Sequence, residues 1–145
     1  MPPRVIELEL TESTLMRDLD QGCEQLEALK RLGLSLALDD FGTGHSSLAY
    51  LAQLPFDRLK IDRSFVQPLP DDATAAELAR TIALLAGGLG LTVVAEGVET
   101  QAQATFLRRC GCHWLQGYLL SPPRPADDIP ALIARGQDWL KRHTD

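Results

Sequence analysis

The sequence contains few cysteines and lacks a long apolar run. Three cysteines cannot all pair with one another, and the Cys110-Gly111-Cys112 spacing is too short for the usual zinc knuckle, so we interpret all three as free thiols. No apolar stretch approaches the roughly 20 residues that span a bilayer, and the N-terminus leads into an amphipathic strand, not a signal peptide. These absences predict a cytoplasmic segment that makes no membrane contact of its own, while a longer parent protein can carry a membrane anchor.

Basic residues are also scarce, with 14 Lys and Arg against 20 Asp and Glu and a net charge of −6. Binding to a nucleic-acid duplex depends on neutralising phosphates with Lys and Arg, so this balance argues against a duplex as partner. A small phosphate ligand held through a metal ion remains compatible with it. The 145 residues are 45% hydrophobic, which is enough for the core of one globular domain.

Short apolar strands alternate with longer helical patterns along the chain. The spacing of apolar residues predicts strands over 5–10, 34–38, 58–61, 92–95 and 113–115. It predicts helices over 16–32, 46–54, 72–88 and 100–110, and C-terminal helices that begin at Pro125 or Asp127. Strand and helix alternating five times is typical of a parallel sheet covered by its crossover helices, so the predicted fold class is α/β.

The same periodicity predicts which large side chains are buried. Leu78, Ile82 and Leu85 share one face of the helix predicted over 72–88. Phe106 and Trp114 lie in apolar periodic runs, so we expect both rings to belong to the core.

Two adjacent carboxylates, Asp39 and Asp40, come directly after an apolar strand and before a glycine-rich turn. Neighbouring side chains on a strand point to opposite faces, so the two serve one site only if the chain turns there. Gly42 and Gly44 permit that turn. The pair is typical of the edge of a divalent-metal site, and the alternative is an Asx-type turn after a buried strand.

Polar side chains lie near the carboxyl end of every predicted strand, which is where parallel sheets bind their ligands. They are Glu9, Glu12, Asp39, Asp40, Lys60, Asp62, Glu96, Glu99 and Gln116. A random distribution would place ionisable residues at both ends of the strands. Their concentration at one end predicts a catalytic or metal site on a barrel-type active face.

Five motifs follow one another along the chain: Glu-Leu-Thr-Glu (9–12), Asp-Asp-Phe-Gly-Thr-Gly-His-Ser-Ser-Leu (39–48), Leu-Lys-Ile-Asp-Arg-Ser-Phe-Val (59–66), Val-Ala-Glu-Gly-Val-Glu-Thr (94–100) and Gln-Gly-Tyr-Leu-Leu-Ser (116–121). In this order they resemble the EAL domain, the bacterial cyclic di-GMP phosphodiesterase family. The resemblance runs from about Val5 to the C-terminus and implies a (β/α)8 TIM-barrel-like fold.

The Glu-Ala-Leu sequence that names the family is absent, and so is the Asn-bearing strand that follows it. A (β/α)8 barrel typically has about 250 residues. We therefore expect residues 1–145 to form a partial EAL domain, an N-terminally incomplete barrel of about five βα units.

The resemblance implies hydrolysis of one phosphodiester bond of cyclic di-GMP to linear pGpG, with two Mg²⁺ or Mn²⁺ ions activating a water. Ions about 3.5–4 Å apart need a bridging carboxylate, and Asp39 matches that position. Asp40 and Glu96 match ligands of the second ion, and Glu9 matches a ligand of the first. The other two protein ligands of the first ion belong to the absent part of the domain.

The resemblance gives Lys60 the role of orienting the attacking water and stabilising charge on the phosphate, with Asp62 holding that lysine. Neutralisation of the carboxylates is the alternative role for Lys60. Glu96 is either the general base or a metal ligand, and the sequence does not separate the two roles.

Three further positions resemble residues around the family's site. Glu12 matches the residue that braces the loop after Asp40. Glu99 and Gln116 match positions that contact the substrate or support the metal ligands. Glu99 has an alternative role as a carboxylate favoured by the dipole at a helix N-terminus, where Thr100 is the predicted cap.

Two function classes follow from this pattern. The first is a phosphodiesterase, and the second is a non-catalytic module that binds cyclic di-GMP or a protein, since some metal ligands are missing. An open sheet edge predicts a homodimer or a strand-exchanged assembly. The resemblance also implies a regulatory domain N-terminal to this segment in a longer parent, and a loop over 42–47 that covers the metal site and couples it to a dimer interface.

Overall fold

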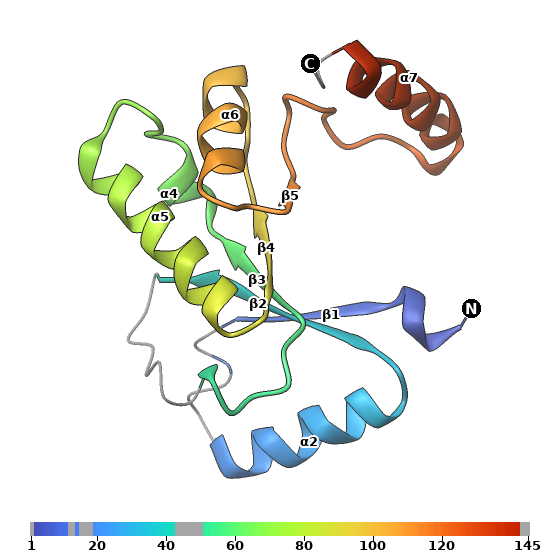
Figure 1. The fold of residues 1–145 in the computed structure, drawn as a ribbon. Helices are drawn as coiled ribbons and strands as arrows, with labels where there is room; N and C mark the ends of the chain where they lie inside the picture. The colour runs from blue at the N-terminus through green and yellow to red at the C-terminus, as the bar shows by residue number, and fades with distance from the viewer. Residues whose placement is uncertain (1, 12–13, 15–18, 43–50, 143–145) are drawn as a thin grey trace.

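The computed structural model describes residues 2–11, 14, 19–42 and 51–142. Its centre is a sheet of five parallel strands: β1 (Glu7–Thr11), β2 (Ser35–Phe41), β3 (Arg58–Ile61), β4 (Thr92–Ala95) and β5 (Trp114–Leu115). Their order in the sheet is their order along the chain (Figure 1). A (β/α)8 barrel has this sequential order, whereas in a doubly wound sheet the order of the strands reverses at one point. The predicted α/β class is confirmed, as a partial barrel.

Helices lie in the connections between the strands and after the last strand. They are α2 (Leu19–Arg31), α4 (Arg63–Val66), α5 (Ala73–Gly88), α6 (Gln101–Arg109) and α7 (Ile129–Arg142), with 3-10 turns η1 (Pro3–Val5) and η2 (Ala126–Asp128). α2 packs on β2, and α5 packs on β3 and β4. The start of the helix predicted over 16–32 and most of the one predicted over 46–54 lie outside the described residues. None of the described helices is both long and apolar enough to cross a bilayer.

Side-chain caps determine where the two central helices begin. The Asp72 carboxylate accepts a hydrogen bond from the backbone N–H of Ala75 at 2.8 Å, at the N-terminus of α5. At the start of α6, the Thr100 hydroxyl accepts from the Gln103 N–H and the Gln103 side chain accepts from the Thr100 N–H, which is a capping box. Because these caps satisfy N–H groups that have no partner within the helix, each helix starts within one residue of its predicted position.

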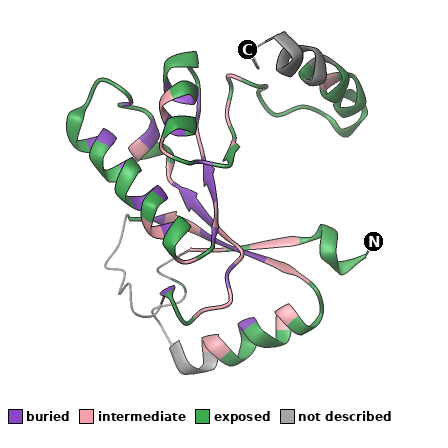
Figure 2. Ribbon diagram, viewed as in Figure 1, coloured by how far each residue is buried: buried purple, intermediate pink, exposed green. Residues whose placement is uncertain are grey.

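The core lies between the central strands and α5. Figure 2 shows buried positions along the strands and on the side of α5 that faces them. The buried face of α5 is mostly alanine, which lets the helix approach the sheet closely: Ala75, Ala76, Ala79, Ile82, Ala83 and Ala86. Burial of this apolar surface supplies most of the stability of the partial barrel.

Two of the predicted core residues are exposed. Leu78 is 43% exposed, because the alanines and Ile82 form the side of α5 that contacts the sheet. Trp114 is 60% exposed, and it lines the concave side of the sheet instead of the side covered by helices. Phe106 is partly buried and packs against the core, as expected.

Candidate active site on the concave face of the sheet

The ammonium group of Lys60 is the centre of the candidate site. Its Nζ lies 2.8 Å from Glu9 Oε1, 3.2 Å from Asp39 Oδ2 and 2.7 Å from Glu96 Oε1. Glu9 comes from β1, Asp39 from β2, Lys60 from β3, and Glu96 directly follows β4. Lys60 is only 4% exposed. Four consecutive strands therefore bring one lysine and three carboxylates into direct contact.

These contacts control the charge of Lys60. Burial alone would lower its pKa, but hydrogen bonds to Glu9 and Glu96, the negative charge of Glu96 and a hydrogen bond to Asp39 outweigh burial and raise the pKa above 10.5. Lys60 is consequently a cation throughout the physiological pH range. Its ammonium has three N–H donors, and it has three carboxylate partners, so each donor can bond to a different side chain.

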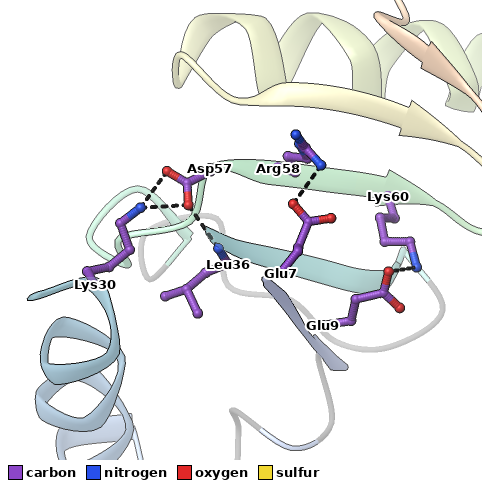
Figure 3. A network of polar contacts seen from close by, with 7 residues as sticks. All are labelled: Glu7, Glu9, Lys30, Leu36, Asp57, Arg58 and Lys60. Carbon is purple, nitrogen blue, oxygen red and sulfur yellow. Dashed lines mark hydrogen bonds and ion pairs between the residues drawn. The ribbon is translucent and has the colours of Figure 1, made fainter. Parts of the chain in front are cut away.

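A small residue on β2 makes the contact between Glu9 and Lys60 possible. Ala37 pairs with Glu9 on one side and with Arg58 on the other, so it lies between β1 and β3 on their shared face. Its methyl group lets the side chains of β1 and β3 meet over β2, as Figure 3 shows for Glu9 and Lys60. Ala37 itself is fully buried beneath them.

A local irregularity in β2 places Asp39 and Asp40. Between Leu38 and Phe41 the register with β3 shifts, and Asp40 has a φ of +55°. The extra residue re-aims the side chains at this point, as in a β-bulge. We expected the glycines of the following turn to provide this change of direction. The structure places it earlier, at Asp40 itself, with Gly42 (φ +95°) continuing it.

The two remaining aspartates at this end of the sheet have opposite pKa shifts. Burial, then repulsion from Asp39 and from Asp62, raises the pKa of Asp40, and Lys60 offsets part of this effect. The pKa of Asp62 is lowered, chiefly because the Ser64 hydroxyl and the Ser64 backbone N–H donate to its carboxylate. Asp62 is the N-cap of α4. The expectation that Asp62 holds Lys60 is therefore wrong: among the described residues Lys60 pairs with Glu9, Asp39 and Glu96.

The other predicted site residues lie near the rim. Glu99 accepts from the guanidinium of Arg63 at 2.8 Å, and both side chains line the concave face together with exposed Gln116. Arg63 crosses directly over Gly97, where an added Cβ would lie 2.3 Å from its Cγ. Glu12 and the 43–47 part of the predicted loop lie outside the described residues.

Sequence reasoning missed a second ion pair on the same face. Glu7 Oε2 and Arg58 Nη1 are 2.7 Å apart, and the Arg58 guanidinium lies 6.0 Å from the centre of the Trp114 ring (Figure 3 shows the ion pair). Glu7 and Arg58 each precede a site residue by two positions, on β1 and on β3. Because side chains on a strand repeat every two residues, this spacing was the signal that places them beside Glu9 and Lys60.

A concave cavity of about 690 Å³ opens above these residues. Its walls are the inward-facing side chains of the strands, the segment after β5 and the first turns of α7. Glu9, Lys60 and Glu96 all line it. A ligand that enters the cavity therefore meets the carboxylate cluster directly.

The donor set is chemically suited to a divalent cation. Glu9, Asp39 and Glu96 supply only oxygen ligands, which Mg²⁺, Mn²⁺ and Ca²⁺ prefer, and they carry two more negative charges than Lys60 neutralises. In the described part of the chain, no three acidic, His or Cys side chains already form a metal-binding group. The ammonium of Lys60 lies between the carboxylates that would form one.

Comparison with known proteins agrees with this geometry. The bifunctional diguanylate cyclase/cyclic di-GMP phosphodiesterase MucR of Pseudomonas aeruginosa is 48% identical over 134 residues, which are 92% of this chain and 20% of that protein. A solved structure titled PaMucR phosphodiesterase, c-di-GMP complex, has a TM-score of 0.85 at 49% identity and covers 89% of this chain and 52% of that one. This chain thus spans only part of its relatives.

A less similar protein has been solved in complexes that include a divalent metal. Klebsiella pneumoniae BlrP1, in complexes with manganese or calcium and cyclic di-GMP, has a TM-score of 0.78 at 35% identity, and the match covers 85% of this chain and 31% of that one. The EAL domain model matches residues 1–123. This match shows that the chain belongs to the EAL domain family, and the sequential parallel strands and the carboxylate cluster agree with it.

Proposed function

We propose that this chain is the metal-binding part of a cyclic di-GMP phosphodiesterase, which hydrolyses the cyclic dinucleotide to linear pGpG. The observation that carries the proposal is the convergence of Glu9, Asp39 and Glu96 on Lys60 from neighbouring strands. Family membership and the cyclic di-GMP complexes of related proteins support it. In this proposal residues 1–145 form one partial EAL domain.

The ligands are Glu9, Asp39, Asp40 and Glu96, and the ions are two divalent cations, Mg²⁺ or Mn²⁺. When bound, such ions lower the pKa of a coordinated water and neutralise charge on the phosphodiester. The ligand set of the first ion is incomplete in this chain. Manganese and calcium in the BlrP1 complexes support a divalent ion.

In the proposed reaction, water hydrolyses one phosphodiester bond with the help of residues of this chain. A water oxygen forms a new bond to phosphorus, the bond from phosphorus to the O3′ leaving group breaks, and O3′ departs as a hydroxyl with the proton taken from the water. Lys60, which is a cation at neutral pH, holds the attacking water in place and stabilises the charge that builds up on the phosphate oxygens. Glu96 is a ligand of the second ion, and its carboxylate lies next to Lys60, with 2.7 Å between Oε1 and Nζ.

Residues around the cluster support it. Asp62 follows Lys60 by two residues, directly after the end of β3, and is the N-cap of α4. Arg63 donates to Glu99 at the rim, and Gln116 lines the same cavity, which supports the proposal that Glu99 and Gln116 contact the substrate or support the ligands. Glu12 would brace the loop that follows Asp40.

A second candidate function is binding of cyclic di-GMP, or of a protein, without turnover. The observation that favours it is that the ammonium of Lys60 occupies the centre of the carboxylate cluster. Among the described residues, no three side chains form a metal-binding group there. Within the described residues, β1 and β5 are the outer strands of the sheet, and an outer strand favours pairing with another chain, as a homodimer or a strand-exchanged assembly. The parent protein would carry an N-terminal regulatory domain, since MucR is about five times longer than the matched segment.

Incubation of the chain with cyclic di-GMP and Mg²⁺ or Mn²⁺, followed by chromatography for pGpG, tests the proposal. Product that is lost in Glu96→Ala and kept in Glu77→Ala, an exposed glutamate on α5, supports a phosphodiesterase. Binding of cyclic di-GMP without product supports the second function. A chain that neither binds nor hydrolyses cyclic di-GMP in the presence of these metals contradicts both.

A further inference from the structure

The contacts of Lys60 are those of a cation held in a cage of carboxylates. Each of its three N–H donors has a carboxylate partner, at 2.7, 2.8 and 3.2 Å. The Lys60 side chain is 5% exposed, whereas the side chains of Asp39 and Glu96 are each 19% exposed and that of Glu9 is 49% exposed. Lys60 is therefore the most deeply buried side chain of the cluster, with three carboxylates next to its ammonium.

The same three carboxylates are the ligands that the proposed function assigns to divalent ions. A metal ion needs carboxylate oxygens at about 2.0–2.6 Å, directed at one point. Here the oxygens of Glu9, Asp39 and Glu96 are directed at Nζ of Lys60. This explains why the described residues contain four proposed ligands yet no ready-made metal-binding group.

We propose that Lys60 is the internal counter-ion of the metal site: its ammonium occupies the carboxylate cluster in the metal-free protein, and it has to withdraw when a divalent cation binds. The inference rests on the proposed function, because it takes these carboxylates to be metal ligands. It adds a competition between the lysine and the metal for the same oxygen atoms.

The surroundings of Lys60 allow such a movement. Lysine carries its charge at the end of a flexible four-carbon stem, so the ammonium can move while the backbone of β3 stays in place. Lys60 lines the cavity of about 690 Å³ that opens above the sheet, which leaves room for the displaced side chain. After withdrawal, the ammonium remains next to the cavity where a phosphodiester would bind.

Two consequences follow for the metal-free protein. The lysine offsets the mutual repulsion of Glu9, Asp39 and Glu96, so it stabilises the fold before the metal arrives. It also weakens metal binding, because the metal has to displace three ion pairs. Removing the ammonium should thus lower stability without metal and raise affinity for metal, a pair of opposite effects that loss of an ordinary structural lysine does not produce.

Lys30 provides the matched control. It forms an ion pair with Asp57, at 2.6 Å to each carboxylate oxygen, near the other end of β3 from Lys60 (Figure 3). Lys30→Met and Lys60→Met remove the same charge and leave side chains of the same size. Only the second removes a cation from the proposed ligands.

Calorimetric titration with Mn²⁺ tests the competition in the wild-type chain, Lys60→Met and Lys30→Met. We expect Lys60→Met to bind Mn²⁺ roughly tenfold or more tightly than the wild type, since a positive charge a few ångströms from the ion is gone. Lys30→Met should keep the wild-type affinity. Thermal unfolding without metal should occur at a lower temperature in Lys60→Met, and added Mn²⁺ should restore more of the loss than in Lys30→Met.

A second measurement uses the wild-type protein, so that it does not depend on the folding of a variant. Acetylation of lysine amines, located by mass spectrometry, should be slow at Lys60 without metal and faster with Mn²⁺, because the ammonium leaves its carboxylate partners. Acetylation of Lys30 should not respond to Mn²⁺.

The outcomes separate the inference from the function on which it rests. If the wild type binds Mn²⁺ but Lys60→Met binds it equally or more weakly, and Lys60 acetylation does not respond to the metal, the competition is wrong and the metal site stands. If neither protein binds Mn²⁺ at millimolar concentrations, the proposed metal site is wrong and the inference is overturned with it.

Discussion

Nζ of Lys60 lies 2.7 Å from Oε1 of Glu96, and the two residues stand at the ends of adjacent parallel strands, β3 and β4. Lys60 pairs in register with Val94, and Glu96 is two residues further along the chain, so its side chain lies on the same face. Glu96 directly follows β4, and its backbone N–H donates to the Ile61 carbonyl at 3.1 Å, so the pairing of the two strands holds the contact. The neighbouring strands β1 and β2 carry Glu9 and Asp39, so changes to the sheet should affect the site directly.

Ala37→Leu should disturb the cluster through the sheet. Ala37 is fully buried between β1 and β3, under the ion pairs Glu7–Arg58 and Glu9–Lys60. A larger side chain there has to push these pairs apart, and overpacking of this kind typically costs about 1–3 kcal/mol. Urea unfolding should show this loss.

Ala73→Leu, at the exposed first position of α5, is the matched control for this substitution. It adds the same side-chain atoms at a site open to solvent, so it should change the free energy of unfolding by less than about 0.5 kcal/mol. An equal loss of unfolding free energy in both variants would contradict the arrangement in which side chains of β1 and β3 meet over Ala37.

Asp40→Asn should stabilise the metal-free protein at neutral pH. The raised pKa of Asp40 means that the folded state favours the neutral acid, so ionisation costs stability above the folded pKa and costs nothing below 3.8. Asparagine also tolerates the φ of +55° at this position. The gain, measured by urea unfolding, should shrink as the pH falls through the folded pKa of Asp40, and it should be absent below 3.8. A variant that is less stable than the wild type without metal would show that Asp40 is not strained by its neighbours.

Asp62→Asn should give the opposite pH dependence. The pKa of Asp62 is lowered, so its ionised form stabilises the fold above the unfolded value of 3.8, and this contribution is lost as the pH falls through the folded pKa. The free-energy difference between wild type and variant should be constant above about pH 5 and decrease in more acid solution. Ser64→Ala, which removes the main hydrogen-bond donor, should reduce the same difference. A difference that does not vary with pH would contradict this role.

Gly97→Ala should destabilise the rim of the site more than Gly90→Ala. Both glycines have positive φ, +67° and +73°, so both substitutions carry the cost of a left-handed backbone, about 1–2 kcal/mol. At Gly90 a Cβ meets nothing within 4 Å, whereas at Gly97 it would lie 2.3 Å from Cγ of Arg63. Adding Arg63→Ala to Gly97→Ala should remove part of the excess loss, because the contacts with Cγ and Cδ of Arg63 disappear while the contact with its Cβ, at 2.9 Å, remains. Equal unfolding temperatures for the two single variants would mean that Arg63 moves aside freely.

Much of the fold could be predicted from the sequence. The bounds of β3 and β4 match the prediction to the residue: β3 alternates basic and apolar residues, β4 is a short and mostly apolar run, and each leads to an acidic residue. Thr100 was predicted as a cap, and it is one, since the local spacing of Thr100 and Gln103 is sufficient to form the capping box. Such features depend only on residues close in sequence.

The partners of Lys60 could not be predicted in the same way. The nearest carboxylate in sequence is Asp62, yet Asp62 is used as the cap of α4, and Lys60 pairs with residues of three other segments. Those contacts depend on the register between strands and on the small size of Ala37. Periodicity also cannot tell which side of a sheet carries the helices, which is why Trp114 was placed in the core but lines the concave face.

The most direct test of the account is whether cyclic di-GMP binding depends on a divalent ion held by these carboxylates. Cyclic di-GMP would be titrated calorimetrically into the chain with and without Ca²⁺, and into Glu96→Ala and Glu77→Ala. We expect binding that requires Ca²⁺, is lost in Glu96→Ala and is kept in Glu77→Ala. Binding of equal strength without a divalent ion, or in Glu96→Ala, would contradict a metal-dependent site at the end of β4.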